Sequence, residues 1–318
     1  MQVALLNNLR AGRNQKRVRQ VLELLRSYPE VHHVETERAG ALPDAIADLA
    51  RRRVDLLIVN GGDGTLQHAL TEILTGNPFQ RVPLIAPLRG GRTNMTALDL
   101  GANPSPVKGL ATVLEAARTG TLAERLVRRP VLRIDSATRR EVQYGMFFGA
   151  GMIHRAVALT HRVFPPGRSQ GVFGAGAVTG AFLLKTAFRA KDGVLTPDKA
   201  QIFLDGEMVP RGEFRLLIAS SLQRLFLKMN PFWGKGRGGV RFTAMAYDAH
   251  RVGWAIPGIL RGRPRAFATP EAGYTSKNSH QADLYFDCGF TVDGEIFPAL
   301  PGEFLTLTAD RRVTFVRA

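Results

Sequence analysis

Residues 54–70, VDLLIVNGGDGTLQHAL, decide the fold of the N-terminal part of the chain. An apolar run rich in β-branched residues, typical of a buried strand, leads into Gly61, Gly62, Asp63 and Gly64, after which apolar residues recur at helical spacing. The stretch predicts a strand, a glycine turn and a helix. In an open parallel sheet, ligands bind beyond the carboxyl ends of the strands, where the next helix begins with free backbone N–H groups.

The same alternation of strand and helix extends over the first third of the chain. Strands are predicted at 3–8, 32–38, 54–59 and 82–87, and helices at 13–28, 43–53, 65–74 and 105–120. Continuous apolar strands between amphipathic helices indicate a parallel sheet that is covered on both faces. We therefore predict an α/β N-terminal domain with a doubly wound parallel sheet over residues 1–124.

After residue 124 the pattern changes to short strand-like segments separated by Gly and Pro. They lie at 126–135, 142–149, 200–207, 214–221, 240–245, 264–269, 282–289, 303–309 and 312–318. Many short strands at such spacing predict a second, mainly antiparallel β domain. We place this domain at residues 125–298 and expect residues 299–318 to pack back on the first domain.

Composition limits the compartment. Cys288 is the single cysteine, so no internal disulfide framework exists and a reducing, cytoplasmic location is expected. The N-terminus lacks the basic start and long apolar run of a signal peptide. The longest uncharged run, Gly171 to Leu184, has 14 residues, too few to span a bilayer. It is either a buried core helix or a segment that lies against a membrane surface.

Positive charge is concentrated in one region. The net charge is +16, and residues 211–265 hold eleven Lys or Arg against two acidic residues. Such a stretch attracts polyanions, unless its arginines are simply a solvated surface. Nucleic acid is not the expected partner, because helix-turn-helix spacing, zinc-finger ligands and aromatic ribonucleoprotein motifs are all missing from the sequence. Phe232 and Trp233, between basic residues, suit either a membrane interface or core packing.

A carboxylate such as that of Asp63 is unexpected in a turn that binds phosphate, because both groups are negatively charged. It repels phosphate unless a cation bridges the two or a sugar hydroxyl donates to it, so it is expected to manage Mg²⁺ or ribose. The glycines are expected to admit a phosphate chain and to adopt dihedrals that a side chain forbids. The spacing matches neither the dinucleotide fingerprint nor the P-loop.

The stretch NGGDGTLQHAL resembles the nucleotide-binding motif of the diacylglycerol kinase catalytic family, which includes sphingosine and ceramide kinases, bacterial lipid kinases and, more distantly, NAD kinases. Four further stretches are similar to family motifs in the same order: LLNNLRAGRN (5–14), APLRGGRTNMTALDLG (86–101), FFGAGMIHRAV (147–157) and FTVDGEIF (290–297). The resemblance thus implies a two-domain lipid kinase.

The resemblance also implies roles for single residues. Asp63 would handle Mg-ATP, Asp293 would be the general base, and Glu295 would support it or bind metal. The residues implied at the nucleotide are Asn7, Gly12, Arg13, Gly61, Gly62, Gly64, Thr65, Gly91, Thr93 and Asn94. The acceptor would be a lipid hydroxyl, of diacylglycerol or a sphingoid-like alcohol, reached by peripheral association with an anionic membrane, and a homodimer is possible.

Two departures from the family pattern keep alternatives open. Arg92 stands where the second glycine loop commonly has threonine, and Thr93 supplies a hydroxyl one place later. A non-catalytic lipid- or nucleotide-binding protein, or a soluble-substrate kinase of the NAD kinase type, would also carry these motifs. A second Asp-Gly-Glu, at residues 205–207, is expected to be a plain hairpin turn.

Overall fold

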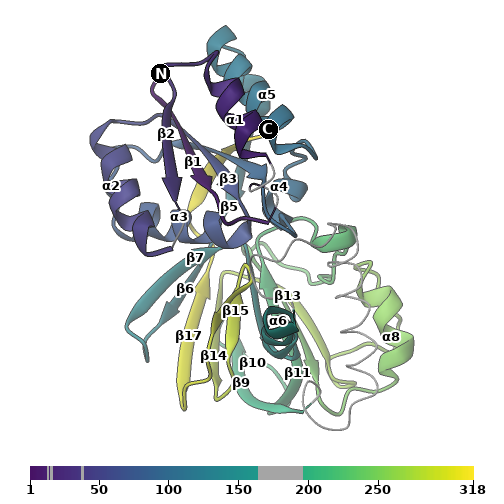
Figure 1. Cartoon of the computed structure of the whole chain (residues 1–318). Helices are drawn as coiled ribbons and strands as arrows, with labels where there is room; N and C mark the ends of the chain where they lie inside the picture. The colour runs from purple at the N-terminus through teal and green to yellow at the C-terminus, as the bar shows by residue number, and fades with distance from the viewer. Residues whose placement is uncertain (13, 15–16, 37–38, 164–195) are drawn as a thin grey trace. The chain divides into compact units, whose positions relative to one another are not determined.

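The computed structural model describes residues 1–12, 14, 17–36, 39–163 and 196–318. Arg13 and the uncharged run at 171–184 lie outside the described residues. The chain divides into two compact units (Figure 1), and the purple elements belong to unit 1 and the green ones to unit 2. Of the described residues, 1–129 and 312–318 form unit 1, and 130–163 and 196–311 form unit 2.

Unit 1 contains the predicted parallel sheet. Its strand order is β2-β1-β3-β4-β18-β5. The strands are β1 (Val3–Asn8), β2 (His32–Thr36), β3 (Leu56–Gly61), β4 (Leu84–Arg89), β5 (Leu126–Pro130) and β18 (Arg312–Val316). β1 pairs in parallel with β2 and β3, and β4 pairs in parallel with β3 and β18. The C-terminal strand therefore extends the N-terminal sheet.

Helices cover both faces of this sheet, as Figure 1 shows, which confirms the doubly wound architecture. α1 packs with α5, and α2 packs with α3. The helical elements are α1 (Val18–Leu25), η1 (Ala39–Ala41), α2 (Leu42–Arg51), α3 (Asp63–Thr75), α4 (Met95–Asp99), α5 (Pro106–Thr119) and η2 (Leu122–Arg125). The apolar residues of β3, which alternate between the two faces, are fully buried because both faces are covered.

Local sequence signals define several helix ends. At the start of α5, Pro106 occupies the first turn and the Ser105 Oγ accepts a hydrogen bond from the Lys108 N–H. Gly120 ends the helix with φ +75°, the left-handed conformation that favours glycine. The helix predicted from residue 13 is shorter in the structure, where α1 spans eight residues.

Unit 2 is the predicted antiparallel β unit, and all its recorded strand pairs are antiparallel. Its strands are β6 (Leu132–Ser136), β7 (Glu141–Gly145), β8 (Phe147–Gly151), β9 (Asp198–Leu204), β10 (Glu207–Met208), β11 (Glu213–Ser220), β12 (Val240–Ala246), β13 (Tyr274–Ser279), β14 (Gln281–Phe286), β15 (Phe290–Val292), β16 (Glu295–Phe297) and β17 (Glu303–Thr308). Alternate residues of these strands form one core around Phe148, Phe214, Phe242 and Phe290. Of the residues 299–318, β17 belongs to this unit and 312–318 to unit 1.

The structure corrects parts of the element prediction in unit 2. Residues 264–269, predicted as a strand, form turns in which Ala268 N–H donates to the Arg265 carbonyl. The sequence pattern predicts neither the strands β13, β15 and β16 nor the helices α6 (Met152–Val163) and α8 (Val252–Ile259), and a short helix η3 (Phe226–Lys228) also occurs. Within the described ranges, every helix is too short or too polar to cross a bilayer.

Candidate active site

Two glycine loops pack against each other at the carboxyl edge of the parallel sheet. A Cβ atom on Gly91 would lie 2.3 Å from the Cα of Gly62, and one on Gly61 would lie 2.6 Å from the Cβ of Thr65. Neither position has room for a side chain. The expectation that Gly61, Gly62 and Gly64 adopt forbidden dihedrals is wrong, because none has a positive φ. Gly91 is required because its backbone lies against that of Gly62, and Gly61 is required because the Thr65 side chain fills the space beside it.

Asp63 is the first residue of α3, and its carboxylate faces the start of α4. One oxygen accepts the Met95 N–H at 2.9 Å and the other accepts the Thr96 N–H at 3.1 Å. These groups form the positive N-terminus of a helix, which stabilises a carboxylate. Burial raises the pKa of the Asp63 carboxyl above its usual value, and the backbone N–H groups of Met95, Thr96 and Asn94 act in the opposite direction.

Asn94 closes the second glycine loop on itself. Its Oδ1 accepts the Gly91 N–H at 2.7 Å, and its Nδ2 donates to the Gly91 carbonyl at 2.8 Å. Asn94 has the left-handed φ of +53° and is buried. The side chain predicted to touch the nucleotide therefore holds the loop that lies against Gly62.

A cluster of asparagines fixes the ends of β1 and β3. Asn60 Nδ2 donates to Asn7 Oδ1 at 2.9 Å, and Asn14 Nδ2 donates to the carbonyls of Asn8 and Asn60 at 2.9 and 2.8 Å. The Oδ1 atoms of Asn14 and Asn60 are buried and have no hydrogen-bond donor among the described residues. Both would lie within 2.8 Å of a Cβ on Gly90. They are available acceptors directly beneath the second glycine loop.

The remaining predicted nucleotide residues divide into two groups. Thr65 is buried, and its Oγ1 accepts from Asn8 Nδ2 at 2.8 Å, which favours a structural part for this side chain. Thr93 is exposed, together with Arg92, at the tip of the second glycine loop. Gly12 lies beside this tip, since its Cβ would be 3.5 Å from the Arg92 Cγ. The structure thus brings the predicted residues of unit 1, apart from the undescribed Arg13, to one edge of the sheet.

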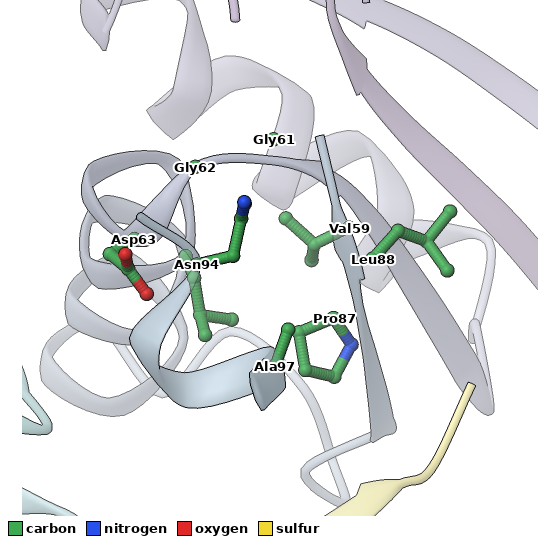
Figure 2. A pocket seen from close by; sticks show the side chains of 9 residues that line it. Val59, Gly61, Gly62, Asp63, Pro87, Leu88, Asn94 and Ala97 are labelled. Carbon is green, nitrogen blue, oxygen red and sulfur yellow. The ribbon is translucent and has the colours of Figure 1, made fainter. Parts of the chain in front are cut away.

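A small pocket opens between the glycine loops. Figure 2 shows Asp63 and Asn94 in its wall with Val59, Pro87 and Leu88 beyond them. Its cavity volume is about 10 Å³, enough for roughly one water molecule. The pocket is therefore too small to hold a triphosphate.

The donor set fits a metal that arrives with a ligand. No cluster of three or more His, Cys, Asp or Glu that could hold a metal occurs in the described part of the chain. Mg²⁺ is commonly bound through one or two carboxylates, substrate phosphates and water. The hydrogen bonds from Met95 and Thr96 use two of the four lone pairs of the Asp63 carboxylate, so this carboxylate could contribute one such ligand.

Asp293 lies in unit 2, in the turn between β15 and β16. Its φ is +50° and that of Gly294 is +93°, the signature of a tight hairpin turn. The buried carboxylate accepts the N–H groups of Met146 at 2.8 Å and Phe147 at 2.9 Å. Glu295, at the start of β16, is half-buried. The pairing of Asp63 with Asp293 across the two units stays a prediction.

The second Asp-Gly-Glu has almost the same geometry. Asp205 and Gly206 have φ values of +54° and +82° and connect β9 to β10, which confirms the predicted hairpin turn. The Asp205 Oδ1 accepts the N–H groups of His280 and Gln281 at 2.8 and 3.1 Å. An aspartate in such a turn can therefore serve only to bind the backbone N–H groups of a neighbouring strand, and this geometry alone does not identify a catalytic base.

Asn8, Asn14 and Asn60 are site residues that the sequence reasoning missed. Asn60 carried a signal, because a polar residue at the end of an apolar strand beside a glycine loop faces the ligand edge of a parallel sheet. Asn14 carried none, since its partners come from β1 and β3.

The chain thus consists of a parallel α/β unit with two glycine loops at its carboxyl edge and an antiparallel β unit. Residues 2–124 match the family of the diacylglycerol kinase catalytic domain. The resemblance indicated by the motifs is thereby confirmed for the stretch that holds both glycine loops. No curated protein matches the sequence.

The whole chain is similar in fold to solved structures from Bacillus anthracis str. Sterne. One, described as a "putative diacylglycerol kinase", has a TM-score of 0.66 and 19% identity, and another, described as a diacylglycerol kinase, has a TM-score of 0.61 and 16% identity. In both comparisons 100% of this chain and 97% of the other are covered. At these identities the likeness concerns the fold.

Proposed function

We propose that this protein is a lipid kinase, which transfers the γ-phosphoryl group of ATP to the hydroxyl of a lipid alcohol such as diacylglycerol. The observation that carries the proposal is the pair of glycine loops packed at the carboxyl edge of a parallel sheet, with Asp63 fixed between them. The match of residues 2–124 to the diacylglycerol kinase catalytic domain supports the same reaction class.

The residues of unit 1 suit a nucleotide that lies across the loops. The space beside Gly62 and Gly91 is filled by the contact between the two loops, so the phosphates are proposed to lie on the outer side of the loops. Arg92 offers a guanidinium at the exposed tip, a group that pairs well with phosphate. This residue replaces the family's usual threonine and keeps the loop suited to an anionic ligand.

Phosphoryl transfer requires little covalent chemistry from the protein. The lipid hydroxyl oxygen forms a bond to the γ-phosphorus, the bond from that phosphorus to the β,γ-bridging oxygen breaks, and ADP leaves. Asp293 is the proposed acceptor of the hydroxyl proton, and Glu295, two residues later, is proposed to support it or to bind metal. Mg²⁺ carried with the nucleotide would neutralise charge on the transferred group. Asp63 would bind this ion either directly through one carboxylate oxygen or through a water molecule that is bound to the ion.

The test uses a matched pair of aspartates. Transfer of labelled γ-phosphate to lipid alcohols in mixed micelles is compared for wild type, Asp293→Asn and Asp205→Asn. Both side chains accept two backbone N–H groups in an Asp-Gly turn, but Asp293 is buried and accepts through both oxygens, whereas Asp205 is exposed and accepts through one. Urea unfolding of both variants is therefore measured beside turnover, so that a loss of folded protein is separated from a loss of catalysis. A general base contributes about 10²–10⁴-fold, so Asp293→Asn should lose that factor while Asp205→Asn keeps wild-type turnover.

Equal turnover of the two variants would remove Asp293 from the mechanism. ATP binding by wild type without phosphate transfer to any lipid or to NAD would contradict the kinase proposal and support the non-catalytic alternative.

A further inference from the structure

Helix α8 is apolar on two opposite faces. Its sequence, VGWAIPGI, contains no charged residue. Ala255 and Ile259 are buried against Met245 and Tyr274 in a satellite core of unit 2. Trp254 points away from that core and is 66% exposed, the largest exposed fraction among the large apolar side chains in the described residues. A soluble helix usually presents polar residues on its outer face, so this exposure needs an explanation.

Arginines flank the exposed face at both ends of the helix. Residues 249–270 contain four arginines and no acidic residue. All four, Arg251, Arg261, Arg263 and Arg265, are exposed. The guanidinium of Arg265 lies 5.5 Å from the centre of the Trp254 ring, so positive charge and aromatic surface are adjacent. Two acids border this stretch: Asp248, which faces Arg211 at 3.5 Å, and the exposed Glu271.

The aromatic pair that seemed suited to a membrane is not the one that is exposed. Phe232 is only 5% exposed, and the Arg241 guanidinium lies over its ring, while Trp233 packs against the same satellite core as α8. Of the two alternatives for this segment, core packing is the one observed. Trp254 instead combines the exposure and the basic surroundings that an interface residue requires.

We propose that α8 and its flanking arginines form a docking surface for anionic lipid bilayers, with Trp254 as the residue that enters the headgroup layer. Tryptophan prefers the boundary between apolar and wet surroundings, and basic residues around it add attraction to anionic headgroups. Charge complementarity selects an anionic membrane over a neutral one. The inference rests on the proposed function for its purpose, since a lipid kinase must reach a substrate that stays in a bilayer.

The chain offers a direct spectroscopic test, because Trp233 and Trp254 are its two tryptophans. The variant Trp233→Phe leaves Trp254 as the single emitter. Its emission should shift to the blue, and be quenched by brominated lipid, when vesicles of phosphatidylcholine mixed with phosphatidylglycerol are added. Vesicles of phosphatidylcholine alone should produce neither change. No shift with either vesicle would overturn the proposal.

Vesicle sedimentation with charge variants tests the arginines. The triple variant Arg261→Gln, Arg263→Gln, Arg265→Gln should bind anionic vesicles on the order of a hundred-fold more weakly, because each basic residue near an anionic surface contributes roughly five-fold. The matched control exchanges three exposed arginines of unit 1, namely Arg19→Gln, Arg26→Gln and Arg81→Gln. Equal losses in both triple variants would reduce the effect to net charge and contradict a specific surface.

A third comparison separates this inference from the proposed function. Trp254→Ala should keep phosphate transfer to a lipid dispersed in detergent micelles but lose transfer to the same lipid in anionic vesicles. Wild type that binds vesicles yet transfers nothing would refute the kinase proposal and leave the docking surface standing. If Trp254→Ala transfers phosphate to the lipid in anionic vesicles as fast as wild type does, the docking surface is refuted and the kinase proposal is not. A change in oligomeric state of Trp254→Ala, with vesicle binding intact, would assign α8 to self-association and also refute it.

Discussion

Replacement of Asp63 separates its part in the fold from its part in the chemistry. Asp63→Ala leaves the N–H groups of Met95 and Thr96 without their acceptor, and Thr96 is fully buried. Hydrogen bonds to a charged group contribute about 1.5–3 kcal/mol each, and the Met95 bond is half-buried, so the expected loss is about 2–4 kcal/mol. Asp63→Asn keeps one acceptor oxygen and should lose about half of that.

Hydrogen–deuterium exchange at α4 is the suitable assay, because both tryptophans lie in unit 2 and their fluorescence does not report on this helix. Asp63→Ala should accelerate exchange of the α4 amides by about 30-fold or more, as each 1.4 kcal/mol is a factor of ten. Wild-type exchange in Asp63→Ala would refute the capping role derived from the two hydrogen bonds.

The pH dependence of the same variants has a definite sign. Burial raises the pKa of Asp63 in the folded state, so the folded protein binds this proton more tightly than the unfolded chain does. The contribution of the protonated Asp63 carboxyl to the free energy of unfolding is fully present below the pKa of the unfolded chain, about 4, and is lost as pH rises through the pKa of the folded protein. The stability of wild type relative to Asp63→Asn should therefore increase towards acidic pH. A difference that stays constant with pH would contradict the raised pKa.

Three further predictions concern packing and ionisation. Gly91→Ala should destabilise unit 1 by about 1–3 kcal/mol in chemical denaturation followed by circular dichroism, because its Cβ would meet the Gly62 Cα at 2.3 Å, and an unchanged midpoint would show that the loops can separate. Burial, and to a smaller extent His32, lowers the pKa of His33, while Glu35, 3.8 Å from its Nε2, acts in the opposite direction. The contribution of His33 to the free energy of unfolding should therefore decrease as pH falls below about 6.5, and His33→Gln should make the free energy of unfolding depend less on pH in this range. Burial, and secondarily Asp198, raises the pKa of the Cys288 thiol to about 12, so iodoacetamide at pH 8 should modify the native protein far more slowly than the urea-unfolded chain, and equal rates would place the thiol at the surface.

Local patterns sufficed for the elements that carry a strong periodic signal. The apolar run before Gly61 is β3, and the apolar spacing after it is α3, because burial on both faces of a parallel sheet imposes those patterns. The pattern of the sequence does not predict the helix α8. Two glycines, one proline and no polar face give it the composition of a turn or strand, and packing of Ala255 and Ile259 on the core decides its conformation instead.

The site was predictable in its location and much less in its contacts. Its place follows from Gly61, Gly62 and Asp63 at a strand end. The contacts of Asp63 come from Met95 and Thr96, more than thirty positions away, and no local pattern indicates such a pairing. For the same reason the sequence predicts special dihedrals for Gly61 and Gly62, whereas neither has a positive φ; Gly62 lies against Gly91 of the other loop, and Gly61 lies against the Thr65 side chain.

The proposed reaction is tested most directly by its stoichiometry. Purified protein is incubated with Mg-ATP and diacylglycerol in mixed micelles. The ADP formed is measured, and the phosphorylated lipid in the extract is identified and quantified by mass spectrometry. A lipid kinase with the site proposed at Asp63 and Asp293 predicts one phosphorylated lipid for each ADP formed. ADP released without phosphorylated lipid, or ATP bound and left intact, would contradict it.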